Sequence, residues 1–317
     1  MHIYNLQDYI ITMICHLCGN SLKTSYTPFC PHCGTRIYTP AQKMVVSIMK
    51  MMPNNKRTSE IITRKQNLLP PQELRSYVGG DGAFHEIGNR FLDHFKILGK
   101  LKRDAAILDV GCGCGRIAIP LTEYLDKTGY YEGFDVDKKS IRWCTENIFS
   151  LYPNFHFQHA EVNNKFYNPE GKFNPENFIF PYNPDSFDFV VLSSVFTHML
   201  PYHMEHYFSE ISRVLKKGGR CFITFFLMNP ESIDLINQKK SSIFSCSDFF
   251  KINEGVYSTN KEVPEQLIAY DEDLIRRIYT KNGLSVKTPF YYGSWCGRTK
   301  CSDFQDIVIA TKQTKFP

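Results

Sequence analysis

Short apolar runs alternate with stretches of helical hydrophobic spacing through most of this 317-residue chain. The runs are too short for helices and long enough for buried strands, which they predict at residues 105–110, 130–135, 154–159, 186–193 and 219–227. The amphipathic stretches between them predict helices at 116–126, 138–150 and 202–215. Alternation of this kind is typical of a parallel, doubly wound sheet. We therefore predict an α/β fold for this part of the chain.

The pattern changes on both sides of these elements. Two helices are predicted between residues 71 and 99, before the first strand. Residues 228–268 are rich in Ser, Asn, Lys and Phe without a clear period, and we interpret them as an inserted substrate lid. A helix at 271–282 and strand-like runs at 284–292 and 306–311 follow.

The amino-acid composition limits the classes of protein to which this chain can belong. Hydrophobic residues make up 43% and charged residues 22%, which is ordinary for a globular protein. No stretch approaches ~18 consecutive apolar residues, and the N-terminus does not have the pattern of a signal peptide. Seven of the eleven cysteines are scattered through predicted strands, helices and turns, which indicates reduced thiols. These features predict a cytoplasmic protein without a membrane span.

Positive charge is concentrated in one segment. Residues 41–76 hold seven Lys or Arg against two Glu, a net +5, whereas residues 77–317 carry a net −1. The main domain therefore has no basic excess of its own with which to hold a polyanion. We interpret residues 39–70 as a helix and a basic linker that lead into it.

The other four cysteines form two pairs near the N-terminus, Cys15 with Cys18 and Cys30 with Cys33. Two C-x₂-C-G knuckles can bring four thiolates together around one tetrahedral zinc. A redox pair is the alternative, but it would need a βαβ context that this region lacks. We predict a structural zinc ribbon over residues 1–38, closed by its four thiolates to water and substrate.

Three glycines follow the first predicted strand at alternate positions, Gly111, Gly113 and Gly115, before a helix begins. A strand, a glycine turn and a helix N-terminus form a cradle in which a ligand can approach the backbone. Arg116 stands where a dinucleotide-binding motif would place its third glycine, which argues against NAD. Asp135 ends the second strand, where an acid commonly binds a ribose. The alternative role of Asp135 is a helix N-cap, but Asp137 is the better candidate for that cap.

These stretches resemble two motifs of the class I S-adenosylmethionine (SAM)-dependent methyltransferases, residues 108–115 the first motif and residues 133–137 the second. Three later stretches resemble further motifs in the same order, at residues 160–162, 186–199 and 213–220. The resemblance implies a mostly parallel seven-stranded sheet whose last strand is antiparallel, within a methyltransferase domain over residues 71–317. It also implies SAM as the cofactor.

The resemblance assigns roles by motif position. Asp109 would orient the methionine ammonium, the glycines of the turn would hold the methionine moiety, and Asp135 would bind the ribose hydroxyls. The adenine would be contacted by Val136, Glu161 and Val162, and the cofactor site would also include Ser193. His198, just beyond the fourth strand, is a candidate general base. The alternative for His198 is packing beside the cofactor without a role in catalysis.

The acceptor of the methyl group is less well defined. The fourth motif lacks the Asn/Asp-Pro-Pro-aromatic signature of many N-methyltransferases. We expect the loop Tyr291–Arg298 to lie over the pocket and hold a planar, hydroxylated or anionic acceptor, with ordinary loop packing as the alternative. A small-molecule or saccharide acceptor is the favoured prediction. The alternatives are an RNA or protein substrate docked through the ribbon and linker, and a SAM-binding regulator without turnover.

Overall fold

The computed structural model describes residues 13–14, 21–22, 68–78, 83–241 and 249–314. Near the N-terminus, β1 (Met13–Ile14) pairs antiparallel with β2 (Ser21–Leu22). The four predicted zinc ligands, Cys15, Cys18, Cys30 and Cys33, lie outside the described residues, as does most of the basic linker. The zinc ribbon therefore stays a prediction.

A seven-stranded sheet in the order β12-β13-β7-β6-β3-β4-β5 forms the centre of the fold. Its strands are β3 (Ala106–Val110), β4 (Tyr130–Asp135), β5 (Phe155–His159), β6 (Phe187–Leu192), β7 (Leu215–Phe225), β12 (Leu284–Val286) and β13 (Asp306–Lys312). Strands β3 to β7 pair in parallel, whereas β13 runs antiparallel to both β7 and β12. The predicted seven strands and antiparallel last strand are confirmed.

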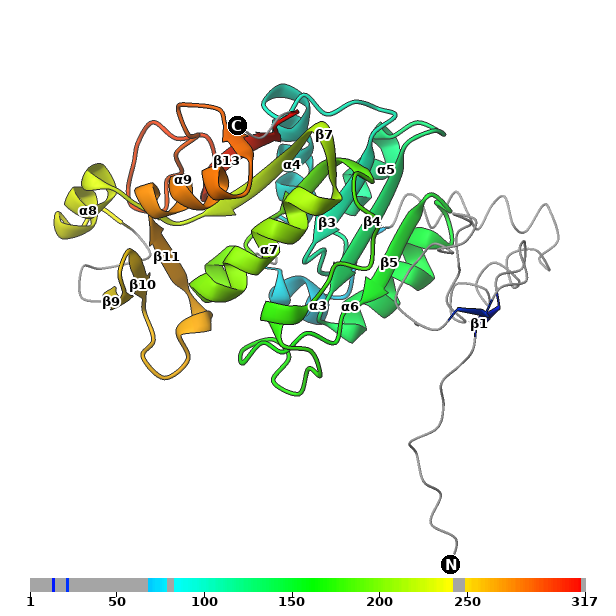
Figure 1. Ribbon diagram of the computed structural model, residues 1–317, viewed down its shortest axis with the longest axis horizontal. Helices are drawn as coiled ribbons and strands as arrows, with labels where there is room; N and C mark the ends of the chain where they lie inside the picture. Colours follow the sequence, from blue (N-terminus) through cyan, green and yellow to red (C-terminus); the bar gives the residue numbers. More distant parts are fainter. Residues whose placement is uncertain (1–12, 15–20, 23–67, 79–82, 242–248, 315–317) are drawn as a thin grey trace, which may run out of the picture.

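Helices cover both faces of this sheet. The α-helices of the described residues are α3 (Gln72–Tyr77), α4 (Phe84–Ile97), α5 (Ala118–Tyr124), α6 (Lys138–Cys144), α7 (Pro201–Val214), α8 (Pro230–Asn237), which packs beside the second sheet instead, and α9 (Glu272–Lys281). Apolar residues of α7 and α9 pack on one face, and those of α4, α5 and α6 pack on the other. Figure 1 shows α7 in front of the sheet and α4 behind it. Because both faces are covered, all five residues of β3 are buried, and the strand appears in the sequence as a continuous apolar run with one exception, Asp109.

Three boundaries differ from the prediction. Strand β7 begins at Leu215, directly after α7, instead of at residue 219. The run at 284–292 is regular only to Val286, and Pro289, which has no backbone N–H to donate, lies in the irregular part. The π-helix Thr145–Phe149 continues the turn of α6.

The expected lid region, residues 228–268, contains more regular structure than its sequence predicted. In its described part, α8 begins with a capping box between Asn229 and Ser232. A second sheet, with strands on both sides of α8 in the chain, has the order β8-β11-β10-β9 and is formed by β8 (Leu227–Met228), β9 (Phe250–Asn253), β10 (Val256–Ser258) and β11 (Ile268–Asp271). Strands of two to four residues are too short to display a period, which is why the sequence did not reveal them.

Within the described ranges, no helix combines the length and the apolar character needed to cross a bilayer.

Candidate cofactor and acceptor site

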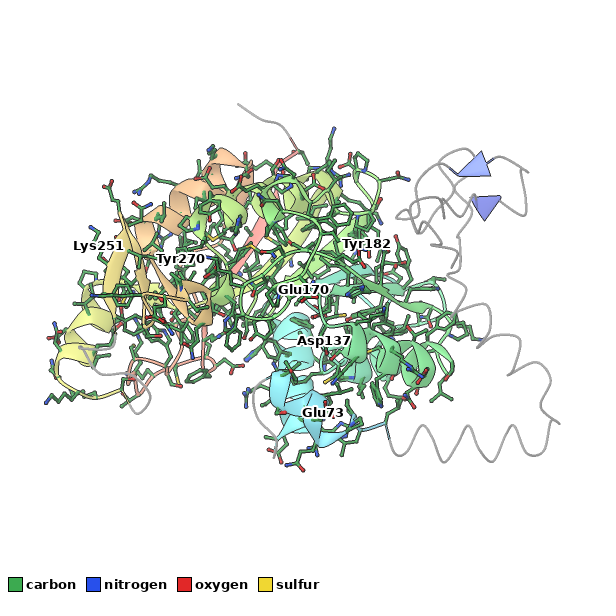
Figure 2. The ribbon with its side chains drawn as sticks, turned by 90° about the horizontal axis from the view of Figure 1, so that it is seen from below. Glu73, Asp137, Glu170, Tyr182, Lys251 and Tyr270 are labelled. Atoms are coloured by element: carbon green, nitrogen blue, oxygen red, sulfur yellow. The ribbon has the colours of Figure 1, made fainter. Side chains whose placement is uncertain are left out.

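A cavity of about 420 Å³ lies where the carboxyl ends of β3, β4 and β6 meet. The carboxyl edge of a parallel sheet is where open α/β folds bind ligands. The cavity wall also includes the end of α3, the loop at 162–175, the segment after β6, and single residues from distant parts of the chain. Figure 2 shows α3, marked by Glu73, beside the start of α6, marked by Asp137, and an ion pair of 2.9 Å joins Glu73 to Lys139 there.

The glycine turn has the geometry that its sequence predicted. Gly111, Gly113 and Gly115 have φ values of +76°, +51° and +84°, in the left-handed region that favours glycine. A Cβ on Gly113 would lie 2.5 Å from Val78 Cγ1, at the end of α3. Arg116, next to the turn, donates a hydrogen bond of 2.5 Å to the Val78 carbonyl. Gly111 and Gly113 line the cavity, and Gly115 lies behind them against α6.

Asp109 presents one carboxylate oxygen without a partner. The side chain is 1% exposed, and its Oδ2 accepts a 2.6 Å hydrogen bond from the Tyr131 hydroxyl. Its Oδ1 is buried and has no hydrogen-bond partner among the described residues, although Asp109 lines the cavity. Burial raises the pKa of Asp109 to about 7, and the Tyr131 hydrogen bond opposes that shift. Such an oxygen can accept from a ligand ammonium, which would return a charge partner to the carboxylate.

Asp135 is tied to the glycine turn. Its Oδ2 accepts from the Gly113 N–H at 2.7 Å and its Oδ1 from the Asp137 N–H at 2.8 Å. Burial raises the pKa of Asp135, and these backbone hydrogen bonds oppose the shift. Asp137, and not Asp135, caps α6, because its side chain accepts from the backbone N–H groups of Lys139 and Ser140. The predicted cap is confirmed, and Asp135 lines the cavity.

The adenine contacts predicted from the motifs are only partly brought together. Val136 and Val162 line the cavity, but Glu161 does not. The Glu161 carboxylate lies 2.7 Å from Lys172 Nζ in an exposed ion pair. Asn163, which the sequence did not single out, lines the cavity in that region instead.

The end of β6 carries a polar cluster that the sequence motifs largely missed. Ser193 was predicted, and its Oγ is buried without a hydrogen-bond partner in the described structure. Ser194, with φ +62°, donates its N–H to Thr224 Oγ1 at 2.8 Å. The hydroxyls of Ser194 and Thr224 both donate to Gln305 Oε1, at 3.1 and 2.5 Å. A non-glycine residue at positive φ is commonly strain retained at a functional site.

His198 lies on the cavity wall in the 3-10 turn Phe196–His198. Its Nδ1 is 3.0 Å from the Glu265 carbonyl, and its Nε2 is 3.3 Å from the Tyr167 hydroxyl. Burial lowers the pKa of His198, and backbone hydrogen bonds at Glu265 and Gln266 oppose the shift. The imidazole is therefore neutral at neutral pH, as a proton acceptor must be.

The loop Tyr291–Arg298 does not line this cavity, so that expectation was wrong. Arg298 is 6% exposed and forms ion pairs with Glu231 and Asp306. The Trp295 indole donates to the same Asp306, at 2.6 Å. The loop is held in the protein interior, because a buried carboxylate satisfies its polar groups there.

No group of three or more His, Cys, Asp or Glu side chains that could hold a metal ion occurs in the described part of the chain. The free cysteines Cys112, Cys114 and Cys144 lie near the glycine turn, and burial raises the pKa of each thiol, which keeps them protonated and unreactive.

A family profile described as a methyltransferase domain matches residues 101–283, more than half of the chain. The chain belongs to this family. The match spans β3 to α9 and contains the glycine turn and Asp135. The protein is thus a methyltransferase, and the unpartnered Asp109 oxygen and the glycine cradle fit SAM as its cofactor.

The methyltransferase also resembles solved structures. A SAM-dependent methyltransferase from Methanosarcina mazei is 22% identical, with 69% of this chain and 98% of that chain covered and a TM-score of 0.47. Magnesium protoporphyrin IX methyltransferase from Synechocystis PCC 6803 is 14% identical (80% and 94% covered, TM-score 0.48). 1,6-Didemethyltoxoflavin-N1-methyltransferase from Burkholderia thailandensis is also 14% identical (83% and 92% covered, TM-score 0.47).

Proposed function

We propose that this methyltransferase transfers the methyl group of SAM to a small-molecule acceptor bound in the cavity at the carboxyl edge of the sheet. The observation that carries the proposal is the cavity itself. Its volume of about 420 Å³ falls in the range of small-molecule sites, and its wall combines apolar side chains such as Val136, Val162 and Phe226 with polar ones.

The residues of the glycine turn and the two neighbouring strands would hold the cofactor. Asp109 Oδ1 accepts from the methionine ammonium, and the backbone of Gly111 and Gly113 lies against the methionine moiety. Asp135, fixed by two backbone N–H groups, accepts from the ribose hydroxyls. Val136 packs on the adenine.

SAM supplies a methyl group already activated by its sulfonium, so the protein needs chiefly to align the acceptor, exclude water and accept a proton. His198 is placed for the last task, because its neutral imidazole lies on the same cavity wall.

Isothermal titration of the full chain with SAM and S-adenosylhomocysteine tests the cofactor assignment. We expect saturable binding of both, with one molecule bound per chain. Binding of NAD in place of either compound would contradict it.

Incubation with methyl-labelled SAM and a metabolite extract tests the acceptor size. We expect the label in a small molecule that passes through an ultrafiltration membrane, while protein and nucleic acid are held back. Label found only in RNA or protein would support the macromolecular alternative and overturn the small-molecule acceptor.

A further inference from the structure

Away from β3, β4 and the turns that follow them, the cavity wall is aromatic and uncharged. Among the described residues, the rings on this part of the wall belong to Tyr77, Tyr167, His198, His203, Tyr207 and Phe226. The charged side chains that line the cavity in the described structure all lie on β3 and β4 or just after them, and they are Asp109, Arg116, Asp135 and Asp137. A buried charge without a partner is far more costly than a hydrogen-bonded neutral group. This wall therefore suits an uncharged planar molecule.

The hydrogen bonds of His198 define its tautomer. The Glu265 carbonyl can only accept, so the nitrogen 3.0 Å away, Nδ1, carries the proton. In the neutral ring, Nε2 is then the acceptor, and the Tyr167 hydroxyl donates to it across 3.3 Å. The phenolic oxygen of Tyr167 keeps its own lone pairs for a donor in the cavity.

Asn164 holds these two groups together. Its Oδ1 accepts from the Tyr167 N–H at 2.9 Å, and its Nδ2 donates to the His198 carbonyl at 3.0 Å. The ring of His198 lies edge-on to that of Tyr167, with centroids 5.1 Å apart, and is stacked on Phe166. Three segments distant in sequence thus converge on one proton acceptor.

A second hydroxyl is available nearby. Tyr207, on α7, is 3% exposed and lines the cavity, and its hydroxyl forms no hydrogen bond with the described residues. Its ring is fixed edge-on against Phe180, with centroids 5.0 Å apart. A buried hydroxyl of this kind gains a partner when an acceptor carries a matching polar group.

We propose that the acceptor is an uncharged aromatic hydroxyl compound, a phenol or enol, whose proton passes through Tyr167 to His198. This rests on SAM binding in the same cavity, as proposed above. A hydroxyl oxygen is a poor nucleophile until its proton leaves, so a base placed here serves an O–H acceptor, whereas a neutral amine would not need it.

The proposed transfer conserves atoms and charge. The acceptor oxygen forms its bond to the methyl carbon while the carbon–sulfur bond breaks and its electron pair returns to sulfur. The acceptor proton moves to the Tyr167 oxygen, and the Tyr167 proton moves to His198 Nε2. The positive charge lost from the sulfonium thus appears on the imidazolium, which later releases its proton to water.

The lowered pKa of His198 supports this acceptor class. Burial of the imidazole lowers this pKa. The groups around the ring are Tyr167, Phe166 and the backbone of Glu265 and Gln266, and Asn164 donates to the His198 carbonyl. Burial also raises the pKa of Tyr167 to about 12, so Tyr167 passes a proton on without remaining ionised. A weak base suits an acidic hydroxyl, such as a phenol, better than the hydroxyl of a saccharide.

Binding to the full chain loaded with S-adenosylhomocysteine tests the class without turnover. The probes are 2-naphthol, 2-methoxynaphthalene and 2-naphthoate, measured by isothermal titration. We expect 2-naphthol to bind up to about tenfold more tightly than its methyl ether, because only the hydroxyl donates to Tyr167. The variant Tyr167→Phe should remove that difference and keep the affinity for S-adenosylhomocysteine. Tighter binding of 2-naphthoate than of 2-naphthol, or a difference that persists in Tyr167→Phe, would overturn the proposal.

Methyl transfer to phenols of different acidity tests the base. At about pH 8, 2-naphthol keeps its proton, as the phenol of tyrosine does, whereas 4-nitrophenol has largely lost it. We expect His198→Gln to slow transfer to 2-naphthol by about 100-fold and to change transfer to 4-nitrophenol little. The matched control is His206→Gln on α7, whose ring contacts the Phe178 carbonyl outside the cavity and which should leave both rates unchanged.

Three outcomes separate the two proposals. If His198→Gln slowed methyl transfer to both phenols equally, His198 would have a structural role, and its proposed role as a base would be overturned. No transfer to either phenol by a chain that binds S-adenosylhomocysteine would overturn the phenolic acceptor alone. Failure to bind S-adenosylhomocysteine at all would overturn the cofactor site on which both proposals depend.

Discussion

The two parts of the cavity are built in different ways. Most of the cofactor part is assembled from one stretch of about thirty residues, Asp109 to Asp137, whose backbone turns and carboxylates hold each other in place. The acceptor part brings together Tyr167, His198, Glu265 and Gln305 from four separate segments. The first part depends on local geometry, and the second depends on long-range packing. Mutations should therefore separate the two functions, cofactor binding and acceptor chemistry.

The largest effect is expected from Gly113→Val. The φ of +51° and the position of Val78, whose Cγ1 would lie 2.5 Å from a Cβ at this residue, both oppose a branched side chain in the cradle. We expect no measurable SAM binding by isothermal titration. The matched control is Gly218→Ala, at φ +76° with no atom within 4 Å of its Cβ, which carries the same backbone strain far from the cavity. If Gly218→Ala also abolished binding, the cradle would not be the cause.

Asp109→Asn should weaken SAM binding by roughly 10- to 100-fold, because it removes the charge from a buried hydrogen bond to the ammonium. The Tyr131 hydroxyl keeps an oxygen to which it can donate, so the fold should persist. Affinity for SAM is measured by titration, and affinity for 2-naphthol on the chain loaded with S-adenosylhomocysteine should change little. Equal losses for both ligands would mean that the two parts of the cavity are not separable.

The affinity for SAM should also depend on pH. The pKa of Asp109 is raised to about 7, so below that pH the carboxyl is protonated and loses its attraction for the ammonium. We expect affinity to fall by up to about tenfold per pH unit below pH 7 and to level off above it. Burial raises the pKa of Asp135 as well, which adds a dependence of the same sign. The dependence of SAM affinity on pH should be weaker in Asp109→Asn. An unchanged dependence would mean that another group causes it.

Thr224→Val tests the packing of the acceptor part. Thr224 is 1% exposed, and its hydroxyl joins the Ser194 N–H to Gln305. Its removal leaves the Ser194 N–H without this acceptor, whereas Gln305 Oε1 keeps the Ser194 hydroxyl, and we expect a cost of about 1–3 kcal/mol in the free energy of unfolding by denaturant. The control Thr280→Val, at an exposed site on α9, should change that free energy by no more than about 0.5 kcal/mol. SAM affinity should be unaffected in both variants.

The smallest effect on the cavity is expected from the N-terminal cysteines. Cys15→Ser should release a bound zinc, detected by elemental analysis, while SAM affinity stays unchanged. A closed set of four thiolates would leave no coordination position for chemistry. Protein purified without chelator that contains no zinc would contradict the predicted ribbon. Loss of SAM affinity in the variant would show that the ribbon and the methyltransferase domain are coupled.

The sequence alone predicted the architecture and most of the residues that line the cavity at the ends of β3 and β4. Buried strands are largely apolar, with exceptions here such as Asp109 and Glu132, so β3, β4, β5 and β6 were recognisable within one or two residues. The cap at Asp137 and the glycines at positive φ are likewise local demands of the backbone, which a few neighbouring residues express.

Only the tertiary structure decided the acceptor part. The sequence did not single out Tyr167, Gln305 or the Glu265 carbonyl, because their partners are 31 to 111 residues away in the chain. The loop Tyr291–Arg298 was misplaced because Arg298 is held in the interior by Asp306, at the start of β13, and by Glu231, which is 67 residues away in the chain. A local pattern records what one segment requires of its own backbone, whereas the choice between a cavity wall and a buried hydrogen-bond network depends on segments that meet only when the chain has folded.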